Sequence, residues 1–554
     1  MKTVTKRHQR GAKVSAALAG VISIALAVTL TSPAQGASKP SPKPTSKTAS
    51  KTAAKPKPMA TKVAAAPKAQ VVTVPQTPLV VAMPTDPVSL NPLEQRVGTT
   101  YSVLRNIYDP LIDLDDSLKA LVPSLATSWS WTTPKTLKLT LRSGVKFSDG
   151  TDFGPDDVVY TINALNGKLP GSKVALAQYI FTTLTGAEKT GTNEVTLTVS
   201  KETPRLPYTL SQLLMIPNKS LDSGSTLATK PVGTGAYTFD HYTPQKEVVL
   251  NANPNYFLGK PAIPKVTFKT IPDVSSRLFA LSTGEVDVVS GLLPSQTGAI
   301  NPGTINKLVS VPTLRMAAVW FNTLETPALK SKAVRQALNY AIDRQGIAKG
   351  LFQGQATVTN TIVPPFFGGV NDSLKPYPYD PAKAKKMLAD AGYENGFSMS
   401  ILVPSARYVL GVEATQAVAA QLNAVGVKAT IKEVPFADFG TLTAQRKIPE
   451  AMFASYGSTL PDPLQLFQVC ARSGGGFSWW KNADFDALVD KAASATDENV
   501  FYDSLSKAEA IMADDPPFIF LYANNGSWGL AKNLKFTPLP NEVVNVFKAS
   551  WVKA

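Results

Sequence analysis

Apolar residues in this chain recur at two different periods. A period of two, typical of strands with one buried face, occurs in 137–141 and 195–199, where every second residue is Leu or Val. A longer period predicts a helix capped by Ser331, because one of its faces would carry only apolar residues: Val334, Ala337, Leu338, Ala341 and Ile342. Strands and helices are therefore mixed along the chain.

Two further helices are delimited by their end residues. The first begins with Asp380 as N-cap and Pro381 at the first helical position, and it ends at Gly392. The second covers 416–425, stops at Gly426 and leads into a strand-like run. A helix, a glycine and a strand in this order form an α/β unit, and no repeat of 20 to 50 residues indicates a solenoid or propeller. The sequence predicts an α/β fold.

Two adjacent carboxylates, Asp156 and Asp157, follow Pro155. As a pair they could be read as catalytic or metal-binding. Proline at the first helical position with acids in the first turn is, however, what the helix dipole favours, and neighbouring helix positions do not face each other. We interpret these acids as a helix start, with Gly154 as a weak N-cap.

The first 77 residues differ from the rest of the chain. Residues 1–37 have a basic start, an apolar run over 14–30 and then small residues, a pattern that predicts an export signal. A buried core helix is the alternative for this run. Residues 38–77 contain Pro, Lys, Ala, Ser and Thr with almost no large apolar side chain, so they predict a disordered linker that holds the folded body near a membrane or cell wall. An inert spacer is equally compatible with this composition.

The formal net charge of +16 is concentrated in the same segment. Residues 1–77 hold thirteen of the 56 Lys and Arg and no Asp or Glu, which leaves 43 basic residues against 40 acidic ones in the body. The body therefore has an ordinary surface charge, and we expect no nucleic-acid partner.

Residues for catalysis and for metal binding are scarce. The chain has two histidines, His8 in the export signal and His241, and one cysteine, Cys470. No metal-ligand spacing, nucleophile motif or phosphate-binding loop occurs. We expect a surface role for His241 and a packed core position for Cys470. The sequence therefore predicts a protein that is not an enzyme and that has no metal and no cofactor; a secreted hydrolase would need a base and a nucleophile that are not found.

Seven short segments in a fixed order give the chain a family resemblance. They are 106–111 (Asn-Ile-Tyr-Asp-Pro-Leu), 125–129 (Leu-Ala-Thr-Ser-Trp), 141–150 (Leu-Arg-Ser-Gly-Val-Lys-Phe-Ser-Asp-Gly), 232–237 (Val-Gly-Thr-Gly-Ala-Tyr), 251–257 (Asn-Ala-Asn-Pro-Asn-Tyr-Phe), 284–287 (Gly-Glu-Val-Asp) and 334–344 (Val-Arg-Gln-Ala-Leu-Asn-Tyr-Ala-Ile-Asp-Arg). From about residue 78 onward the chain resembles the extracellular solute-binding proteins of ABC importers, family 5, the dipeptide, oligopeptide and nickel group.

The resemblance implies a bilobal periplasmic-binding-protein fold of type II with an additional inserted subdomain. Transferred to this sequence, the parts are lobe I (78–116, 229–315 and 516–554), the inserted subdomain (117–228) and lobe II (316–515). The crossings near Arg315 and Pro516 are the expected hinges.

The resemblance also implies ligand-binding residues in the cleft. It points to the loop led by Tyr456, in which Thr459 stands where peptide-binding relatives have an Asp that holds the ligand's α-amine. Asp462 could supply an acid nearby, or it could be structural. Further candidates are Asp86, after the first strand, and Trp320 with Asn322 at the entry to lobe II; each could equally pack or cap locally. Nickel and haem are disfavoured because the body offers one His and one Cys, far apart.

The predicted function is that of an exported, cell-envelope-associated receptor. It would capture a small solute or peptide between two closing lobes and deliver it to an ABC permease with its ATPase subunits, and it would be a monomer. A sensor or a peptide-binding chaperone on the same fold is the alternative. The sequence does not name the ligand.

Overall fold

The computed structural model describes residues 77–94, 98–170, 172, 181–222, 226–300, 306–367, 371–405, 407–458, 460 and 462–552. The predicted export signal and nearly all of the predicted linker lie outside these residues. The helices are α1 (Gly98–Ile107), α2 (Pro155–Leu165), α4 (Leu206–Leu210), α5 (Val274–Ser282), α6 (Pro327–Lys330), α7 (Lys332–Tyr340), α8 (Arg344–Phe352), α9 (Pro381–Asp390), α10 (Gly411–Ala424), α11 (Phe436–Ala444), α12 (Pro463–Cys470), α13 (Ala483–Ser494), α14 (Glu498–Asp514) and the 3-10 helix η1 (Pro294–Ala299). In the described part of the chain, no helix combines the length and apolar character needed to cross a bilayer.

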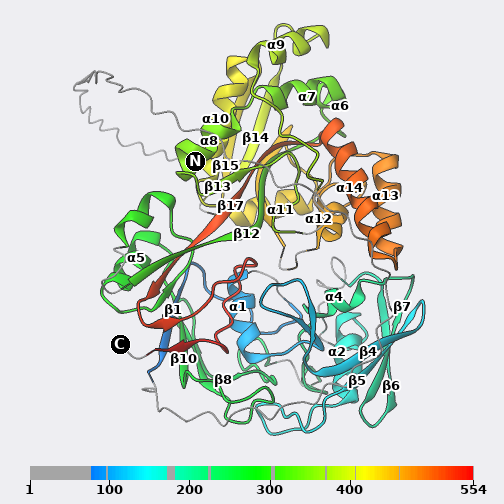
Figure 1. Ribbon diagram of the computed structural model, residues 1–554, viewed down its shortest axis with the longest axis vertical. Coiled ribbons are helices and arrows are strands. Elements are labelled where there is room, and N and C mark those ends of the chain that lie inside the picture. The colour runs from blue at the N-terminus through cyan, green and yellow to red at the C-terminus, as the bar shows by residue number, and fades with distance from the viewer. Residues whose placement is uncertain are drawn as a thin grey trace, which may run out of the picture. The chain divides into compact units, whose positions relative to one another are not determined.

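One mixed sheet of eleven strands runs through the molecule in the order β15-β14-β16-β12-β17-β11-β1-β10-β9-β8, with β13 paired to β17 beside this path (Figure 1). Its strands are β1 (Leu79–Met83), β8 (Tyr237–Thr243), β9 (Glu247–Ala252), β10 (Lys265–Thr270), β11 (Val288–Val289), β12 (Asn306–Phe321), β13 (Ala356–Val358), β14 (Ser398–Pro404), β15 (Lys428–Val434), β16 (Ala451–Gly457) and β17 (Phe518–Ala531).

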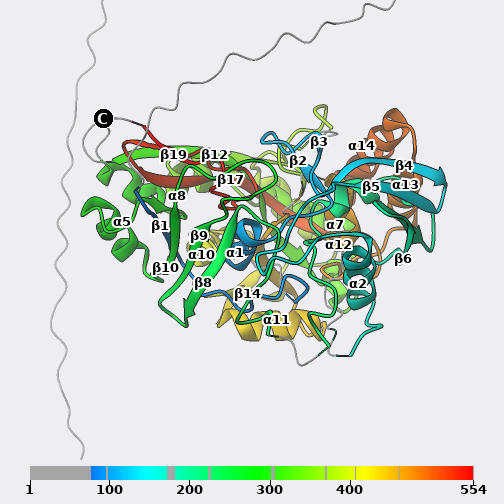
Figure 2. The same ribbon diagram turned by 90° about the horizontal axis from the view of Figure 1, so that it is seen from below.

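Separate from this sheet, four strands form an antiparallel sheet in the order β4-β5-β7-β6, which Figure 2 shows as one group beside α2. Its strands are β4 (Ala126–Thr133), β5 (Thr136–Leu141), β6 (Leu184–Gly191) and β7 (Glu194–Val199). Two hairpins complete the strands: β2 (Ile112–Leu114) with β3 (Leu121–Pro123), and β18 (Leu534–Lys535) with β19 (Ser550–Trp551). The buried faces of β5 and β7 share a hydrophobic core with β1, so this sheet is not an isolated unit.

The long strands β12 and β17 link the two ends of the large sheet. They are antiparallel from Asn306 opposite Ala531 to Trp320 opposite Phe518. Figure 1 shows them side by side from the part that holds β1 to the part that holds β14. The register of this pairing shifts at two places, between Pro312 and Met316 and between Ala317 and Ala318. At the first place, Pro312 has no N–H to donate. The first shift leaves a short stretch of β12 around Arg315 without a partner in β17, while Arg315 stays paired with Gly457 of β16.

Helices cover both faces of the sheet formed by β12, β14 and β16. Alternate residues of one strand point to opposite faces. Val319, Phe453 and Ile401 therefore pack in the cluster with α7 to α10, whereas Trp320, Met452 and Leu402 pack in the cluster with α11 to α14. This explains why these strands read as continuous apolar runs, whereas β5, with one solvent-facing side, alternates strictly.

Three of the short segments that carry the family resemblance meet in one buried place. The Gly235 amide donates to the Ile107 carbonyl at 2.8 Å, and buried Asp109 accepts hydrogen bonds from Thr234 Oγ1 and from the Tyr256 hydroxyl, each at 2.8 Å. Burial raises the pKa of the Asp109 carboxyl to about 6. These motifs therefore fix the fold in this region rather than bind a ligand.

The local predictions from the sequence are confirmed, with one boundary moved. Ser331 caps α7 through the Val334 amide, and Asp380 caps α9 through the Lys383 amide. The predicted helix 416–425 begins five residues earlier, at Gly411. The acidic pair has structural partners, because Asp157 accepts from the amides of Gly154 and Asn218, while Asp156 pairs with Lys189.

A buried carboxyl in α14 predicts an unusual pH dependence of stability. Glu509 is 1% exposed and accepts from Thr361 Oγ1 at 2.8 Å and from the Asn371 amide at 2.6 Å. Burial raises its pKa to about 7, above the value of the unfolded chain. The folded state therefore binds the proton more tightly, so the free energy of unfolding should rise by up to about 3 kcal/mol as pH falls from 8 to 5.

The isosteric variant Glu509→Gln should lose this pH dependence and should be more stable than the parent at pH 8 but not at pH 5. Urea unfolding of both proteins at a series of pH values measures the effect. Glu433→Gln, at an exposed position of β15, is the control that should leave the pH profile unchanged. Parallel profiles of the parent and Glu509→Gln would contradict the assignment.

Candidate functional site

The loop singled out by the family resemblance starts at the end of β16, next to the interrupted part of β12. Tyr456 lies opposite Met316 and Gly457 lies opposite Arg315. The half-buried Tyr456 ring packs edge-on against Phe477, with 5.6 Å between the ring centroids. Thr459 lies outside the described residues. The loop therefore begins beside Arg315, at the end of β16.

Arg315 is held in this position by β16 and by the C-terminal segment that follows β18. Its guanidinium donates to the Glu542 carboxylate and, at 3.4 Å, to the Ser455 carbonyl. A Cβ at Gly457 would come within 2.8 Å of the Arg315 Cγ, so the glycine leaves room for this side chain. The sequence named Arg315 only as a possible hinge position, and the structure shows that its side chain forms an ion pair with Glu542.

Arg407 supplies a second guanidinium beside the first. It follows β14 and lies over the rings of Tyr408, at 5.4 Å, and Phe436, at 5.0 Å. Burial, and then the positive charge of Arg315, lower the pKa of Arg407. No carboxylate of the described residues forms an ion pair with Arg407; Glu542 pairs with Arg315. Two guanidinium groups therefore lie near one carboxylate, which forms an ion pair with Arg315 alone.

Asp462 has protein partners. It caps α12 through the Leu464 amide at 3.1 Å, and its other carboxylate oxygen accepts from Arg205 Nε at 3.0 Å. The side chain of Asp462 is 8% exposed. Both carboxylate oxygens of Asp462 accept hydrogen bonds from the protein. These contacts fit the structural role that the sequence left open, and they give no support to a ligand contact.

The remaining sequence candidates lie apart from the arginine pair. Asp86 accepts from Tyr242, from the Gln245 amide and from Thr270, and it therefore ties the end of β1 to β8 and β10. Trp320 is 1% exposed and packs edge-on against Phe518 at 5.1 Å. Asn322 is 2% exposed and donates to the carbonyls of Ile448 and Pro449. These contacts are those of packing and capping residues.

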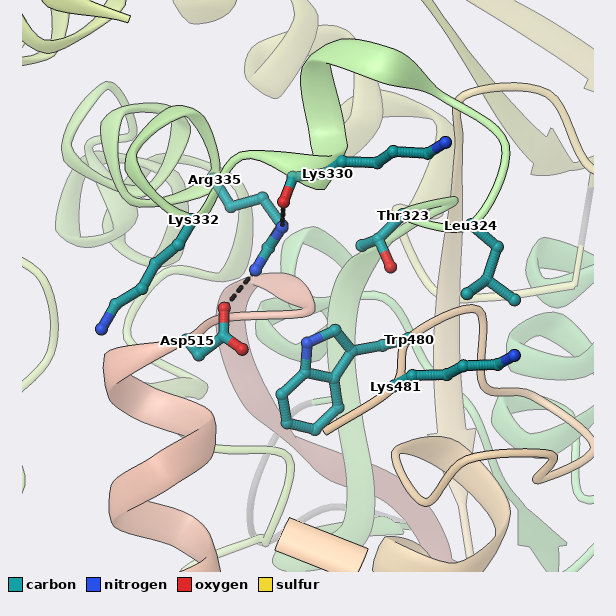
Figure 3. Close-up of a pocket in the computed structure, with 8 residues that line it drawn as sticks. All are labelled: Thr323, Leu324, Lys330, Lys332, Arg335, Trp480, Lys481 and Asp515. Carbon is teal, nitrogen blue, oxygen red and sulfur yellow. Dashed lines mark hydrogen bonds and ion pairs between the residues drawn. The ribbon is translucent and has the colours of Figure 1, made fainter. Parts of the chain in front are cut away.

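Two surface hollows lie away from this place. The first, of about 370 Å³, is lined by Thr323, Leu324, Lys330, Lys332, Arg335, Trp480, Lys481 and Asp515 (Figure 3). Its central guanidinium, Arg335, already donates to Asp515 and to the carbonyls of Leu329, Lys330 and Pro516. The second, of about 490 Å³, lies along α5 next to the exposed Phe279. Neither hollow offers a buried polar group aimed at a ligand.

His241 and Cys470 lie in different environments and do not form a catalytic pair. His241 is exposed on β8 beside Asp240, and Cys470 is 2% exposed in the cluster with α12. Burial raises the pKa of the Cys470 thiol, so the thiolate is disfavoured. Among the described residues, no three His, Cys, Asp or Glu side chains gather as metal ligands.

A mixed sheet whose two ends are linked by β12 and β17, with helices on both faces, is the architecture of a type II periplasmic binding protein. Comparison with known proteins agrees. The family model for bacterial extracellular solute-binding proteins, family 5 Middle, matches residues 120–478, and the chain belongs to this family. The predicted type II fold is confirmed by a solved structure, the ABC transporter-associated periplasmic binding protein DppA from Helicobacter pylori in complex with the peptide STSA. Its TM-score is 0.78 at 24% identity, over 86% of this chain and 98% of that one.

Curated relatives cover most of the chain. The dipeptide-binding protein of Escherichia coli (strain K12) is 26% identical over 494 residues, 82% of this chain and 89% of that protein. Heme-binding protein A of Haemophilus influenzae is 27% identical over 466 residues, 78% of this chain and 84% of that protein. The chain is thus a substrate-binding protein of the ABC-importer class, which works outside the cytoplasm with a membrane permease.

Proposed function

We propose that the solute carries a carboxylate or a comparable anionic group, which binds at Arg315 and Arg407 in a cleft between two lobes. The lobes are those predicted from the sequence: lobe I (78–116, 229–315 and 516–554) with the inserted subdomain (117–228), and lobe II (316–515). Closure would occur about the crossings near Arg315 and Pro516.

The guanidinium excess at this place is the observation that carries the proposal. Arg407 is partly buried, its pKa is lowered, and no acid among the described residues forms an ion pair with it, since Glu542 pairs with Arg315. An anionic ligand would restore the charge balance through charge-assisted hydrogen bonds. Tyr408, Phe436, Tyr456 and Phe477 contribute aromatic faces nearby, as binding sites for small organic solutes commonly do. Relatives are named for dipeptides or heme, or were solved with a nonapeptide, and these ligands are compatible with an organic anion as the solute.

A thermal-shift experiment tests the proposed ligand class. The probe is a pool of free-acid peptides of two to five residues, compared with the same pool carrying C-terminal amides. A ligand at a hundredfold excess over Kd stabilises the folded protein by about 2.7 kcal/mol. We expect a shift with the free acids and little with the amides. Equal shifts would place recognition elsewhere, and the absence of any shift with peptides, oligosaccharides and metal chelates would count against solute binding altogether.

Thr459 leads to a prediction for the other end of a peptide. Because Thr459 replaces the amine-binding Asp, and Asp462 and Asp86 are hydrogen-bonded within the protein, free-amine peptides should bind no better than N-acetylated ones. Calorimetric titration of matched pairs measures this. A preference of tenfold or more for the free amine, about 1.4 kcal/mol, would show that another acid holds it.

We also propose that the protein is an exported monomer. An apolar run over 14–30, flanked by basic residues, either is cleaved with the export signal or stays as an anchor, and the basic linker then contacts anionic lipid or wall polymer. Cell fractionation and sequencing of the mature N-terminus distinguish the two. A chain that starts near Gln35 or Ala37 and is found in the medium would exclude the uncleaved anchor.

A further inference from the structure

Three residues of the predicted inserted subdomain contact lobe II outside the strands β12 and β17: Leu118, Lys119 and Arg205. Tyr208 contacts Lys119 and Arg205 from within the subdomain, and we call the four residues the clasp. Leu118 and Lys119 form the tip of the β2-β3 hairpin, and Arg205 directly precedes α4. Their partners in lobe II are Asp462 at the start of α12, Phe501 in α14, and Phe366. These contacts connect the predicted inserted subdomain directly with lobe II.

Arg205 makes the strongest of these contacts. Its Nε donates to Asp462 Oδ2 at 3.0 Å, and the two side chains are 16% and 8% exposed. The guanidinium carbon lies 4.2 Å from the ring centroid of Tyr208 and 4.3 Å from that of Phe501. A planar cation is therefore stacked on one ring from the subdomain and one ring from lobe II, with its counter-ion in lobe II. This combination exists only when both parts are in contact.

The hairpin tip adds an apolar contact. Leu118 is 4% exposed, and it is buried in the cluster of lobe II that holds Phe467, Phe501 and Trp480. Its backbone has a φ of 58°, a left-handed conformation that a leucine rarely adopts and that tertiary contacts must hold. The neighbouring Lys119 ammonium lies over Phe366 at 5.4 Å, and its carbonyl accepts from the Tyr208 hydroxyl at 3.0 Å. The four clasp residues thus form one connected set.

We infer that the clasp closes the cleft: it forms when lobe II meets the subdomain, it breaks when the lobes open, and Arg205 is a positioning residue that sets how long a solute is retained. This inference rests on the proposed two-lobe capture. Contacts made only in the closed state shift the open–closed equilibrium by their own free energy and leave the ligand contacts unchanged. Arg205 and Asp462 regain water on opening, so the net gain on closing is modest and the equilibrium stays reversible.

Distances between spin labels on the ligand-free full chain test the clasp without any ligand. Lys135→Cys in the subdomain and Lys491→Cys in α13 supply exposed labelling positions, while the native Cys470 is buried. The variants are Arg205→Gln, Asp462→Asn and their combination. Asparagine at position 462 retains an oxygen for the Leu464 amide, so the cap of α12 is preserved. Lys189→Gln, which breaks an exposed pair within the subdomain, is the matched control.

We expect two distance populations in the parent and an at least threefold smaller short-distance population in Arg205→Gln and in Asp462→Asn. The double variant should have about the same short-distance population as either single variant, because each single variant already breaks the Arg205–Asp462 pair. With a free-acid peptide that binds, the dissociation rate should rise about tenfold in Arg205→Gln. Distance distributions identical in the parent, the variants and the Lys189→Gln control would overturn the inference, and they would leave the proposed ligand class standing because that is measured with peptides and amides.

Discussion

Gly233→Ala is expected to lower the free energy of unfolding by about 3 kcal/mol, the upper end of the usual cost of an added methyl in a packed core. A Cβ at this position would collide with the Ile107 carbonyl oxygen and would lie 2.8 Å from the Tyr108 ring, both of them buried. The Gly233 carbonyl also accepts from the Ser148 amide at 2.9 Å, so the segment cannot move away without losing that bond. Urea unfolding followed by tryptophan fluorescence measures the loss.

Gly440→Ala is the matched control, since it makes the same substitution in the opposite environment. Gly440 lies inside α11, and a Cβ there meets nothing within 4 Å. Alanine in a helix interior is favoured over glycine by up to about 1 kcal/mol, so this variant should be as stable as the parent or more so. An equal loss in the two variants would mean that the close approach at Ile107 is not the cause.

Arg407→Gln is expected to weaken binding of the free-acid peptide pool about 100-fold, which corresponds to about 2.7 kcal/mol. Removal of one partner from a buried, hydrogen-bonded charge pair costs 2 to 5 kcal/mol or more. Of the two arginines, Arg407 has no ion-pair partner among the described residues. Its removal should therefore weaken ligand binding without breaking an ion pair within the protein. Calorimetric titration with the peptide from the pool that binds best measures the change.

Two further variants make this result specific. Arg407→Lys retains the charge but loses the planar donors, and an intermediate affinity is expected. Arg472→Gln removes the same charge from an exposed pair with Asp490, and it should leave the affinity unchanged. If Arg407→Gln and Arg472→Gln bind alike, the arginine pair does not contact the ligand.

The elements that the sequence predicted correctly are those determined by local chemistry. Ser331 and Asp380 cap helices because their side-chain oxygens reach amides three residues ahead, and that spacing is visible in the sequence. The alternation in β5 is visible for the same reason, since one face of that strand is buried and the other is not. The family motifs predicted the fold only through the resemblance. In the structure they make contacts between distant segments, such as Gly235 with Ile107.

The candidate site was less predictable because it depends on partners far along the chain. Asp462 was open to two interpretations until its partner Arg205 was known, 257 residues away. Arg407 lies in no motif, and the sequence around it shows neither its proximity to Arg315 nor that Glu542 pairs with Arg315. The contacts of Trp320 and Asn322 are likewise with residues far along the chain, Phe518 and the carbonyls of Ile448 and Pro449.

The pairing of β12 with β17 has a consequence for the order in which this chain can fold during synthesis. The strand β17 lies between β12 and β11 in the sheet, so it borders the part that holds β1 as well as the part that holds β16. Residues of β17 also lie in the three largest hydrophobic clusters, with Trp528 in one, Phe518 in another and Ile519 in a third. Neither half can complete its sheet before Phe518–Ala531 has left the ribosome, and pairings over such long separations form slowly. The four-stranded sheet β4-β5-β7-β6 is made long before that point, but the eleven-stranded sheet can be completed only after β17, late in the chain, has been synthesised.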